Sequence, residues 1–311
     1  MDRNSPYHLQ VALLLRILPF IAQEKCFALK GGTAINLFVR DFPRLSVDVD
    51  LVYVPDADRE AALSVIKQAL DRIAESVLRA LPATHIFKSY VDRADALRLV
   101  INQAGVSVQV ELSPVLRGTV FPVELRAVSE AVEREFGFAE IPVVALEDLY
   151  AGKLCATFDR QHPRDFFDVM LLLENEGITD AIRHAFLVYL MSHPRPMEEI
   201  LEPKWRSISS VFKGEFLGMT LRQTSENELQ HAAELALRTL LTGFTESEKQ
   251  FLYSLYLLAP AWDALPFDHI KNLPAVRWKL TNIAKMSKEK RMVSLGKLEE
   301  VLNSNGKARG C

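Results

Sequence analysis

The feature that most constrains this chain is a glycine pair placed directly after a short apolar run. Residues 26–29 are apolar, and Lys30, Gly31, Gly32 and Thr33 follow at once. This pattern is typical of a buried strand that stops at a tight turn, with Thr33 expected to cap the next helix. Glycines at such a helix start leave backbone N–H groups that an anion can approach.

A strand with two aligned aspartates comes next. Residues 44–52 read Arg-Leu-Ser-Val-Asp-Val-Asp-Leu-Val, so Asp48 and Asp50 share one face of the strand and valines share the other. Two neighbouring carboxylates repel each other unless a cation lies between them. The pair therefore indicates a divalent metal site beside the glycine turn, although aspartates that simply face water remain an alternative.

A third carboxylate is expected on a later strand. Residues 86–91, 97–102 and 106–112 alternate like strands of a meander. In the last of them Glu111 points away from its apolar neighbours. If it lies on the face of the two aspartates, it completes a three-carboxylate site; otherwise it is an exposed strand glutamate.

A second polar block lies further along the chain. Residues 145–158 have helical spacing, with Lys153 among apolar neighbours, where it either extends to solvent or meets a negative group. Asp165 is expected to cap the following helix. From the residues alone, Arg164 and Asp168 are an ordinary surface pair four residues apart.

Together these motifs resemble the AbiEii family of nucleotidyltransferases, the toxins of abortive-infection toxin–antitoxin pairs within the polymerase-β-like superfamily. The runs that carry the resemblance are GGTAINLF, RLSVDVDL and the later lysine helix with Arg-Asp-x-x-Asp. Thr33 stands where serine is commoner in the superfamily. The resemblance implies an α/β fold of the α+β kind, with a mixed sheet, and a helical C-terminal domain.

The resemblance also implies a set of site residues. The implied catalytic residues are Asp48, Asp50, Glu111, Lys153 and Asp165. The implied nucleotide-binding residues are Lys30, Gly31, Gly32, Thr33, Ser46, Lys153, Arg164 and Asp168. Asp48, Asp50 and Glu111 are implied to hold Mg²⁺, in a two-metal site, with a nucleoside triphosphate (NTP) as substrate.

Composition fits a globular protein of two domains, which we place at residues 1–175 and 176–311. Of the 311 residues, 49% are hydrophobic and 25% charged. The three cysteines (Cys26, Cys155 and Cys311) have no disulfide spacing. With neither a signal peptide nor a membrane span in the pattern, a cytoplasmic protein with no membrane partner is expected.

Charge is spread unevenly along the chain. The segment from Lys271 to the end carries a net charge of +7, and the rest carries −10. Such a segment is either a solvated surface or a contact for a polyanion. Trp278 either belongs to the core or stacks on a base, with Arg277 and Lys279 neutralising phosphates.

The predicted function is nucleotide transfer from an NTP to an RNA acceptor, with the tRNA 3′ end favoured and translation blocked as the result. A cognate antitoxin encoded nearby is expected as a partner. The alternatives are nucleotidylation of a protein or a small molecule, and a non-catalytic module that binds nucleotide or RNA.

Overall fold

The computed structural model describes residues 5–220 and 222–304, which fold as two compact units. The first unit runs to Leu149 and is joined by residues 215–223; the second comprises residues 150–214 and the chain from Thr224. The division falls inside helix α6 (Leu146–Arg160), earlier than the boundary predicted after residue 175. Residues 150–175 group with the second unit because helix α7 (Pro163–Glu174) packs along α11 (Glu226–Gly243).

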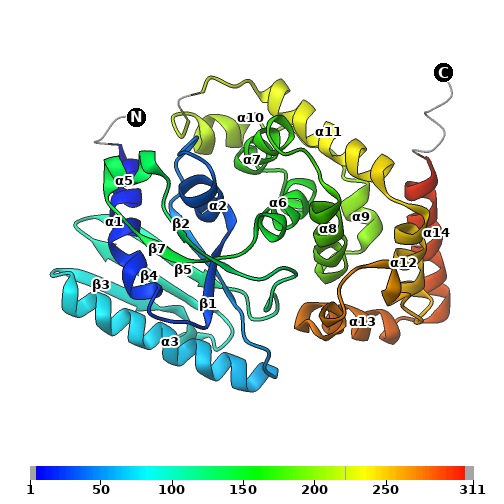
Figure 1. Ribbon diagram of the computed structural model, residues 1–311, viewed down its shortest axis with the longest axis horizontal. Coiled ribbons are helices and arrows are strands. Elements are labelled where there is room, and N and C mark those ends of the chain that lie inside the picture. Colours follow the sequence, from blue (N-terminus) through cyan, green and yellow to red (C-terminus); the bar gives the residue numbers. More distant parts are fainter. Residues whose placement is uncertain (1–4, 221, 305–311) are drawn as a thin grey trace. The chain divides into compact units, whose positions relative to one another are not determined.

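A mixed sheet forms the centre of the first unit (Figure 1). In spatial order, the strands found in the described residues are β3 (Thr84–Lys88), β4 (Arg98–Gln103), β5 (Val106–Leu112), β2 (Asp48–Tyr53), β1 (Phe27–Lys30), β7 (Glu140–Val143) and β6 (Glu124–Ala127). β2 is parallel to β5 and β1 is parallel to β7, whereas the other neighbours are antiparallel. The predicted α/β fold with a mixed sheet is confirmed.

One face of this sheet is buried under α1 (Pro6–Ile21) and α3 (Arg59–Ala80), which contact each other and the strands (Figure 1). The alternating residues that point toward these helices, such as Val49, Leu99 and Val110, are fully buried. Burial of each such side chain stabilises the fold by about 1.5–3 kcal/mol. The opposite face of β3, β4 and β5 carries polar and exposed residues, so it is available for chemistry.

Shorter elements complete the first unit. They are α2 (Gly31–Ala34), which continues into the π-helical turn η1 (Ile35–Val39), and the helices α4 (Ser89–Asp92) and α5 (Glu130–Phe136). The segment from Glu215 returns to this unit through an antiparallel bridge between Arg44 and Thr220. Leu45 N donates to Met219 O at 2.8 Å in the same contact.

Several boundaries differ from the predicted ones for physical reasons. β3 ends at Lys88 rather than Val91, because Ser89 begins α4. The segment 113–140, for which the sequence pattern above predicts neither strand nor helix, contains β6, α5 and the start of β7. β6 is four residues long and mostly exposed, so it has no apolar alternation by which to recognise it.

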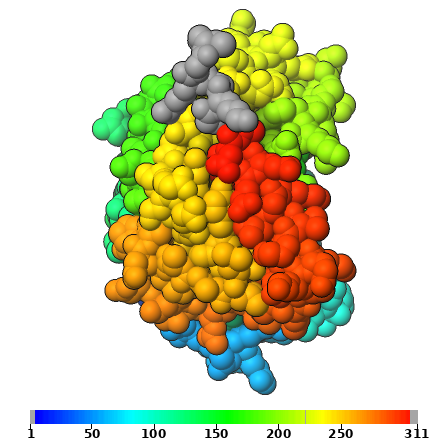
Figure 2. Space-filling view, turned by 90° about the vertical axis from the view of Figure 1, so that its right-hand side faces the viewer, coloured from blue at the N-terminus to red at the C-terminus, as the bar shows by residue number. Residues whose placement is uncertain are grey.

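The second unit is helical in the residues described. Besides most of α6 and α7, its helices are α8 (Asp180–Ser192), α9 (Met197–Leu201), α10 (Ser209–Val211), α11, α12 (Glu246–Tyr256), α13 (Pro274–Lys285) and α14 (Lys288–Ser304). The π-helical turn η2 (Phe212–Phe216) spans the division, and the short 3-10 turns η3 (Trp262–Ala264) and η4 (His269–Asn272) precede α13. Figure 2 shows α14, in red, alongside α12 and α13. The predicted helical C-terminal part is confirmed.

Capping side chains fix where the helices of this unit begin. Ser225 and Thr245 each form a capping box with a glutamate three residues later, at the starts of α11 and α12. No helix in residues 5–220 or 222–304 is both long and apolar enough to cross a bilayer.

Candidate functional site

Strand register brings the two central acids of the first unit together. Asp50 on β2 is the direct partner of Glu111 on the parallel strand β5 and of Lys30 on β1. Directly opposed residues share a face of a sheet, and Asp48, two residues before Asp50, shares it too. Glu111 therefore lies on the same face as the two aspartates, as the sequence pattern required for a three-carboxylate site.

The glycine turn lies against Asp50. Gly31 has a φ of +74°, and a Cβ built on it would lie 2.4 Å from Asp50 Oδ2. Any side chain at this position would collide with the carboxylate and strain the backbone. A Cβ on Gly32 would lie 2.8 Å from Arg44 Nη2 and 3.0 Å from Ser46 Oγ. Both glycines are thus required by the close approach of residues 44–50.

The expectation that Thr33 caps the helix is wrong. Lys30 occupies the N-cap position, and the Thr33 side chain is 1% exposed. Its hydroxyl lies 2.5 Å from the Asp48 carbonyl oxygen and 3.0 Å from Ser46 Oγ. In this structure the Thr33 and Ser46 side chains tie the glycine turn to the start of β2, and both are buried.

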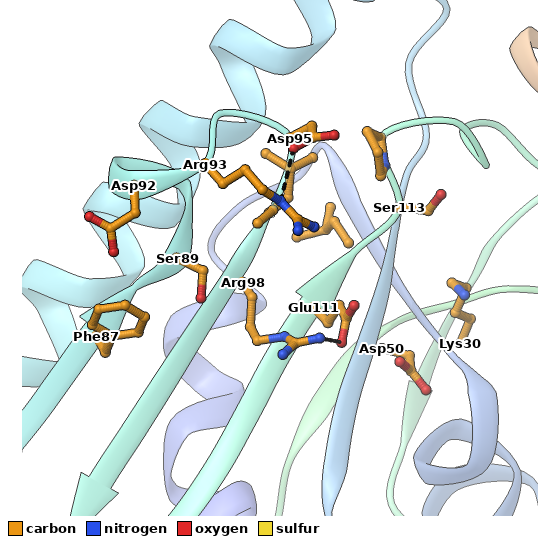
Figure 3. Close-up of a pocket in the computed structure, with 14 residues that line it drawn as sticks. Lys30, Asp50, Phe87, Ser89, Asp92, Arg93, Asp95, Arg98, Glu111 and Ser113 are labelled. Atoms are coloured by element: carbon orange, nitrogen blue, oxygen red, sulfur yellow. Dashed lines mark hydrogen bonds and ion pairs between the residues drawn. The ribbon is translucent and has the colours of Figure 1, made fainter.

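A cavity of about 580 Å³ extends from Lys30 and Asp50 across β5 and β4 to β3 (Figure 3). Its size is that of a pocket for a small ligand. Arg98 on β4 stands directly opposite Glu111, and its Nη2 donates to Glu111 Oε2 at 2.9 Å. The exposed ring of Phe87 marks the far end of the cavity on β3.

The donor set fits a divalent cation held partly by substrate. No three His, Cys, Asp or Glu side chains within residues 5–220 and 222–304 are grouped to bind a metal on their own. Mg²⁺ is usually held by one or two carboxylates together with phosphate oxygens and water, so Asp48 and Asp50 are a sufficient protein contribution. Glu111 is engaged by Arg98 in this structure.

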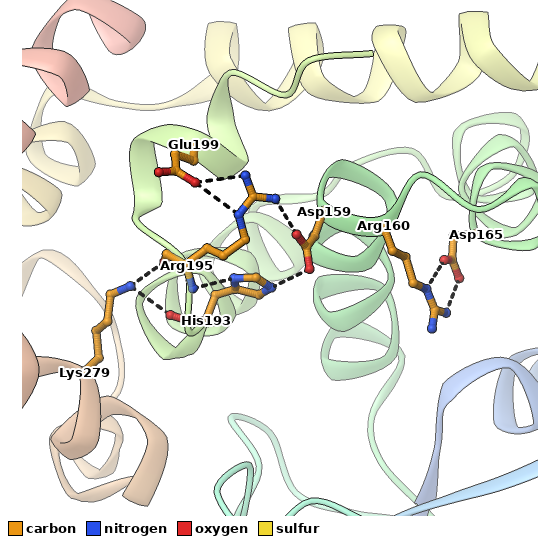
Figure 4. Close-up of polar contacts among 7 residues, drawn as sticks. All are labelled: Asp159, Arg160, Asp165, His193, Arg195, Glu199 and Lys279. Carbon is orange, nitrogen blue, oxygen red and sulfur yellow. Dashed lines mark hydrogen bonds and ion pairs between the residues drawn. The ribbon is translucent and has the colours of Figure 1, made fainter. Parts of the chain in front are cut away.

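The second acidic cluster is sealed inside the second unit. Lys153 on α6 is 6% exposed, and its Nζ lies 2.8 Å from Asp165 Oδ1 and 3.0 Å from Asp168 Oδ2. Arg160 adds a two-pronged contact to Asp165, 2.5 Å from Nε and 2.9 Å from Nη2 (Figure 4). Both aspartates have no exposed surface.

These contacts correct two interpretations of the second block. Asp165 does not cap α7; the cap is the His162 side chain, which accepts from Arg164 N, and Asp165 lies in the first turn. Asp168 is not part of an ordinary surface pair, because it is buried against Lys153. The Lys153 ammonium is directed at carboxylates of its own unit.

Electrostatics explain why Asp165 is ionised although it is buried. Burial alone raises the pKa of a carboxyl, but Lys153 and Arg160 outweigh it and hold the pKa of Asp165 well below its usual range. A buried carboxylate with two cationic partners is a fixed structural charge rather than a proton donor near neutral pH.

The C-terminal residues proposed to contact nucleic acid differ in their exposure to solvent. The Trp278 side chain is 41% exposed, so it is not a core residue. Lys279 is buried and donates to the carbonyls of His193 and Arg195, holding α13 to the end of α8, so it does not neutralise phosphate (Figure 4). Burial lowers the pKa of Lys279 to about 8. Lys307, Arg309 and Cys311 lie outside the described residues.

Comparisons with known proteins now identify the fold and its class. A family model for the nucleotidyl transferase AbiEii toxin of the type IV toxin–antitoxin system matches residues 12–281. The chain belongs to this family. It is therefore a nucleotidyltransferase toxin, an enzyme of a class that uses an NTP and a divalent metal and is paired with an antitoxin.

A solved structure gives the same fold. MenT4, the nucleotidyltransferase toxin Rv2826c from Mycobacterium tuberculosis H37Rv, matches with a TM-score of 0.63 and 17% identity, over 91% of this chain and 95% of that chain. None of the curated proteins compared matches this sequence.

Phe87, Arg93 and Arg98 line the cavity described above but were not singled out in the sequence. A signal for Arg98 was present. The two-residue turn at Ala104 and Gly105, both with positive φ, pairs Gln103 with Val106. Counting outward from that hairpin places Arg98 opposite Glu111. Phe87 and Arg93 had no such signal.

Proposed function

We propose that this toxin transfers a nucleotide from an NTP to an RNA acceptor in a Mg²⁺-dependent reaction. The tRNA 3′ end is the favoured acceptor, and its modification would block translation. The observation that carries the proposal is the register that sets Asp50 opposite Glu111 on the open face of the sheet, directly beside the Gly31 turn.

Each site residue of the first unit has a proposed role that follows from its position. Gly31 and Gly32 give the triphosphate close access to backbone N–H groups, and Lys30 adds a positive charge at the same turn. The Thr33 hydroxyl supports the turn through its contacts with Ser46 Oγ and with the Asp48 carbonyl oxygen. Asp48 and Asp50 would hold the metal ions, for which a two-metal arrangement with Glu111 at its edge is proposed. When bound, Mg²⁺ would neutralise charge that builds up on the phosphates.

Glu111 is the proposed general base. The acceptor hydroxyl oxygen attacks the α-phosphorus, and the new O–P bond forms as the bond between that phosphorus and the α–β bridging oxygen breaks. Pyrophosphate leaves with the electron pair, and the hydroxyl proton passes to the Glu111 carboxylate. The ion pair between Glu111 and Arg98 is partly exposed on both sides and therefore weak, so it can open when the acceptor arrives.

The roles of the second-unit residues remain a proposal from the family resemblance. Lys153 would contact the triphosphate, with Asp165 and Asp168 fixing the direction of its ammonium group and Arg164 as a nearby phosphate partner. The buried contacts of Lys153 with both aspartates support a positioning role for Asp165 and Asp168.

RNA is favoured over other acceptors because of the positive charge from Lys271 onward and the exposed Trp278 within that segment. A cognate antitoxin encoded nearby and a cytoplasmic location complete the proposal.

The test is incubation of the protein with each labelled NTP, Mg²⁺ and total tRNA. Label on the RNA is the expected result. Label on protein or on a small molecule would show that this class of molecule, and not RNA, is the acceptor. RNA binding without any label would show that the protein is a non-catalytic binding module. Arg277→Ala is expected to weaken RNA labelling, whereas Lys279 is unsuitable for this test because it holds α13 to α8.

A further inference from the structure

The open face of the sheet carries a row of side chains that runs from the glycine turn to the edge strand β3. Adjacent strands β1, β2, β5, β4 and β3 present, in that order, Lys30, Asp50, Glu111, Arg98 and Phe87 (Figure 3). The register confirms that they share one face: Asp50 opposes Lys30 and Glu111, Arg98 opposes Glu111, and Phe87 opposes Val100, two residues from Arg98.

This order separates two substrates. The NTP is assigned to the glycine turn and Asp50, at one end of the cavity. The group that must receive the nucleotide then lies on the other side of Glu111, where β4 and β3 continue the cavity. We propose that the terminal nucleoside of the RNA acceptor binds there, with its base stacked on Phe87 and its hydroxyl at Glu111; this rests on the function proposed above.

Phe87 has the properties of a stacking platform. Its side chain is 53% exposed although it lies on a strand, and it lines the cavity rather than the core. A planar ring left in solvent within a cavity of about 580 Å³ suits a nucleobase, whose stacking on an aromatic side chain is tolerant of base identity.

The charges of the cavity favour one nucleoside over a run of phosphates. Among the lining residues, Asp50, Asp92, Asp95 and Glu111 outnumber Lys30, Arg93 and Arg98. Two of the cations are already engaged, because Arg93 Nε lies 3.3 Å from Asp95 Oδ1 and Arg98 pairs with Glu111. A surface that binds a run of phosphates would need more positive than negative side chains. The end of an RNA chain, which presents one nucleoside and one flanking phosphate, does not need that excess.

Arg98 is the proposed partner for that phosphate. It holds Glu111 through Nη2, and its Nε has no hydrogen-bond partner among the described residues. When Glu111 turns to the acceptor hydroxyl, the guanidinium is released beside the bound nucleoside. Arg98 then contributes to acceptor affinity while leaving the NTP untouched.

The test compares Phe87→Ala with Phe138→Ala. Phe138 is a matched control because it is also a phenylalanine of the first unit, 61% exposed and outside the cavity. With a tRNA transcript and a saturating NTP, Phe87→Ala is expected to raise the KM for RNA about tenfold or more and to leave the KM for NTP unchanged. Phe138→Ala is expected to match the wild type, and Phe87→Trp is expected to retain the wild-type KM.

A second measurement does not depend on catalysis. A tRNA transcript ending in 2-aminopurine should lose fluorescence when its last base stacks on wild-type protein, and keep it with Phe87→Ala. Arg98→Ala should raise the KM for RNA, with partial recovery in Arg98→Lys. Arg126→Ala, which breaks a comparably exposed pair with Glu124 on β6, should not change it.

The outcomes separate this inference from the function on which it rests. If wild-type protein labels RNA but Phe87→Ala behaves like Phe138→Ala, the nucleoside pocket is wrong and the transfer reaction stands. If wild-type protein labels no RNA, the proposed function fails and the pocket assignment falls with it.

Discussion

The two units use aspartates in opposite ways. In the first unit, Asp48 and Asp50 share the open face of the sheet, and Asp50 lines the cavity with a glycine turn pressed against it. In the second unit, Asp165 and Asp168 have no exposed surface and share the Lys153 ammonium. A carboxylate that must bind a transient ligand keeps access to solvent, whereas one that supports the fold is neutralised by its neighbours.

Because of this contrast, removing a carboxylate should have different consequences for catalysis and for stability in the two units. Removing an open carboxylate removes a ligand for substrate but leaves no buried charge behind, so catalysis suffers more than stability. Removing a sealed one leaves the buried Lys153 ammonium under-compensated, so stability suffers. Substitutions in the two clusters should therefore give opposite patterns.

The largest expected effect is on catalysis at Asp50. Asp50→Asn should lower nucleotide transfer by about a thousandfold, corresponding to about 4 kcal/mol of transition-state stabilisation, because an amide is a poor ligand for a divalent cation. The thermal midpoint should stay close to that of the wild type. Labelling rate and Tm measured on the same preparation check both statements; retained transfer would remove Asp50 from the site.

The next effect is on stability at Asp165. Asp165→Asn should reduce the free energy of unfolding by about 3–5 kcal/mol, because the buried Lys153 ammonium loses one of its two carboxylate partners and the largely exposed Arg160 loses its contact with the interior. Urea unfolding measures this. Asp180→Asn is the matched control, since Asp180 also pairs with an arginine but lies on the surface, and its midpoint should not move. Equal midpoints for both variants would contradict a sealed cluster.

A smaller effect appears as pH dependence. Lys153 and Arg160 hold the pKa of Asp165 below the value of about 3.9 that it has in an unfolded chain, so its stabilising contribution is complete above that value and is lost as pH falls toward the folded pKa. One such group changes stability by at most about 1.4 kcal/mol per pH unit. Between pH 5 and 3, Asp165→Asn should lose stability less steeply than the wild type; parallel curves would refute the assignment.

The smallest effect concerns the glycine turn. Gly31→Ala and Gly105→Ala both place a side chain at a positive φ, which costs about 1 kcal/mol each. A Cβ at Gly31 also meets Asp50, whereas one at Gly105 meets nothing within 4 Å. Transfer should therefore fall about tenfold more in Gly31→Ala than in Gly105→Ala. Equal transfer rates would show that Asp50 tolerates displacement.

Sequence reasoning succeeded where local pattern determines structure. Alternation on β2 and β5 put Asp50 and Glu111 on correct faces, and the helical spacing of residues 145–158 predicted the helix α6. These features depend on near neighbours in the chain.

Sequence reasoning failed where a long-range contact decides. Thr33 has the pattern of a cap, but its hydroxyl is bound by Asp48 and Ser46 across the turn. Trp278 and Lys279 are adjacent, yet Trp278 is exposed while two carbonyls of the α8 end bind Lys279. Phe87 belongs to a cavity that exists only once β3 pairs with β4.

Metal binding tests the central claim most directly, since the claim is that the carboxylates of the open acidic face, and not those of the sealed cluster, bind the metal. Mn²⁺ can be titrated by electron paramagnetic resonance in the presence of a non-hydrolysable NTP analogue. Wild-type protein and folded Asp165→Asn are expected to bind Mn²⁺ alike, and Asp50→Asn is expected to lose binding. Undiminished Mn²⁺ binding by Asp50→Asn, with loss in folded Asp165→Asn, would contradict the account.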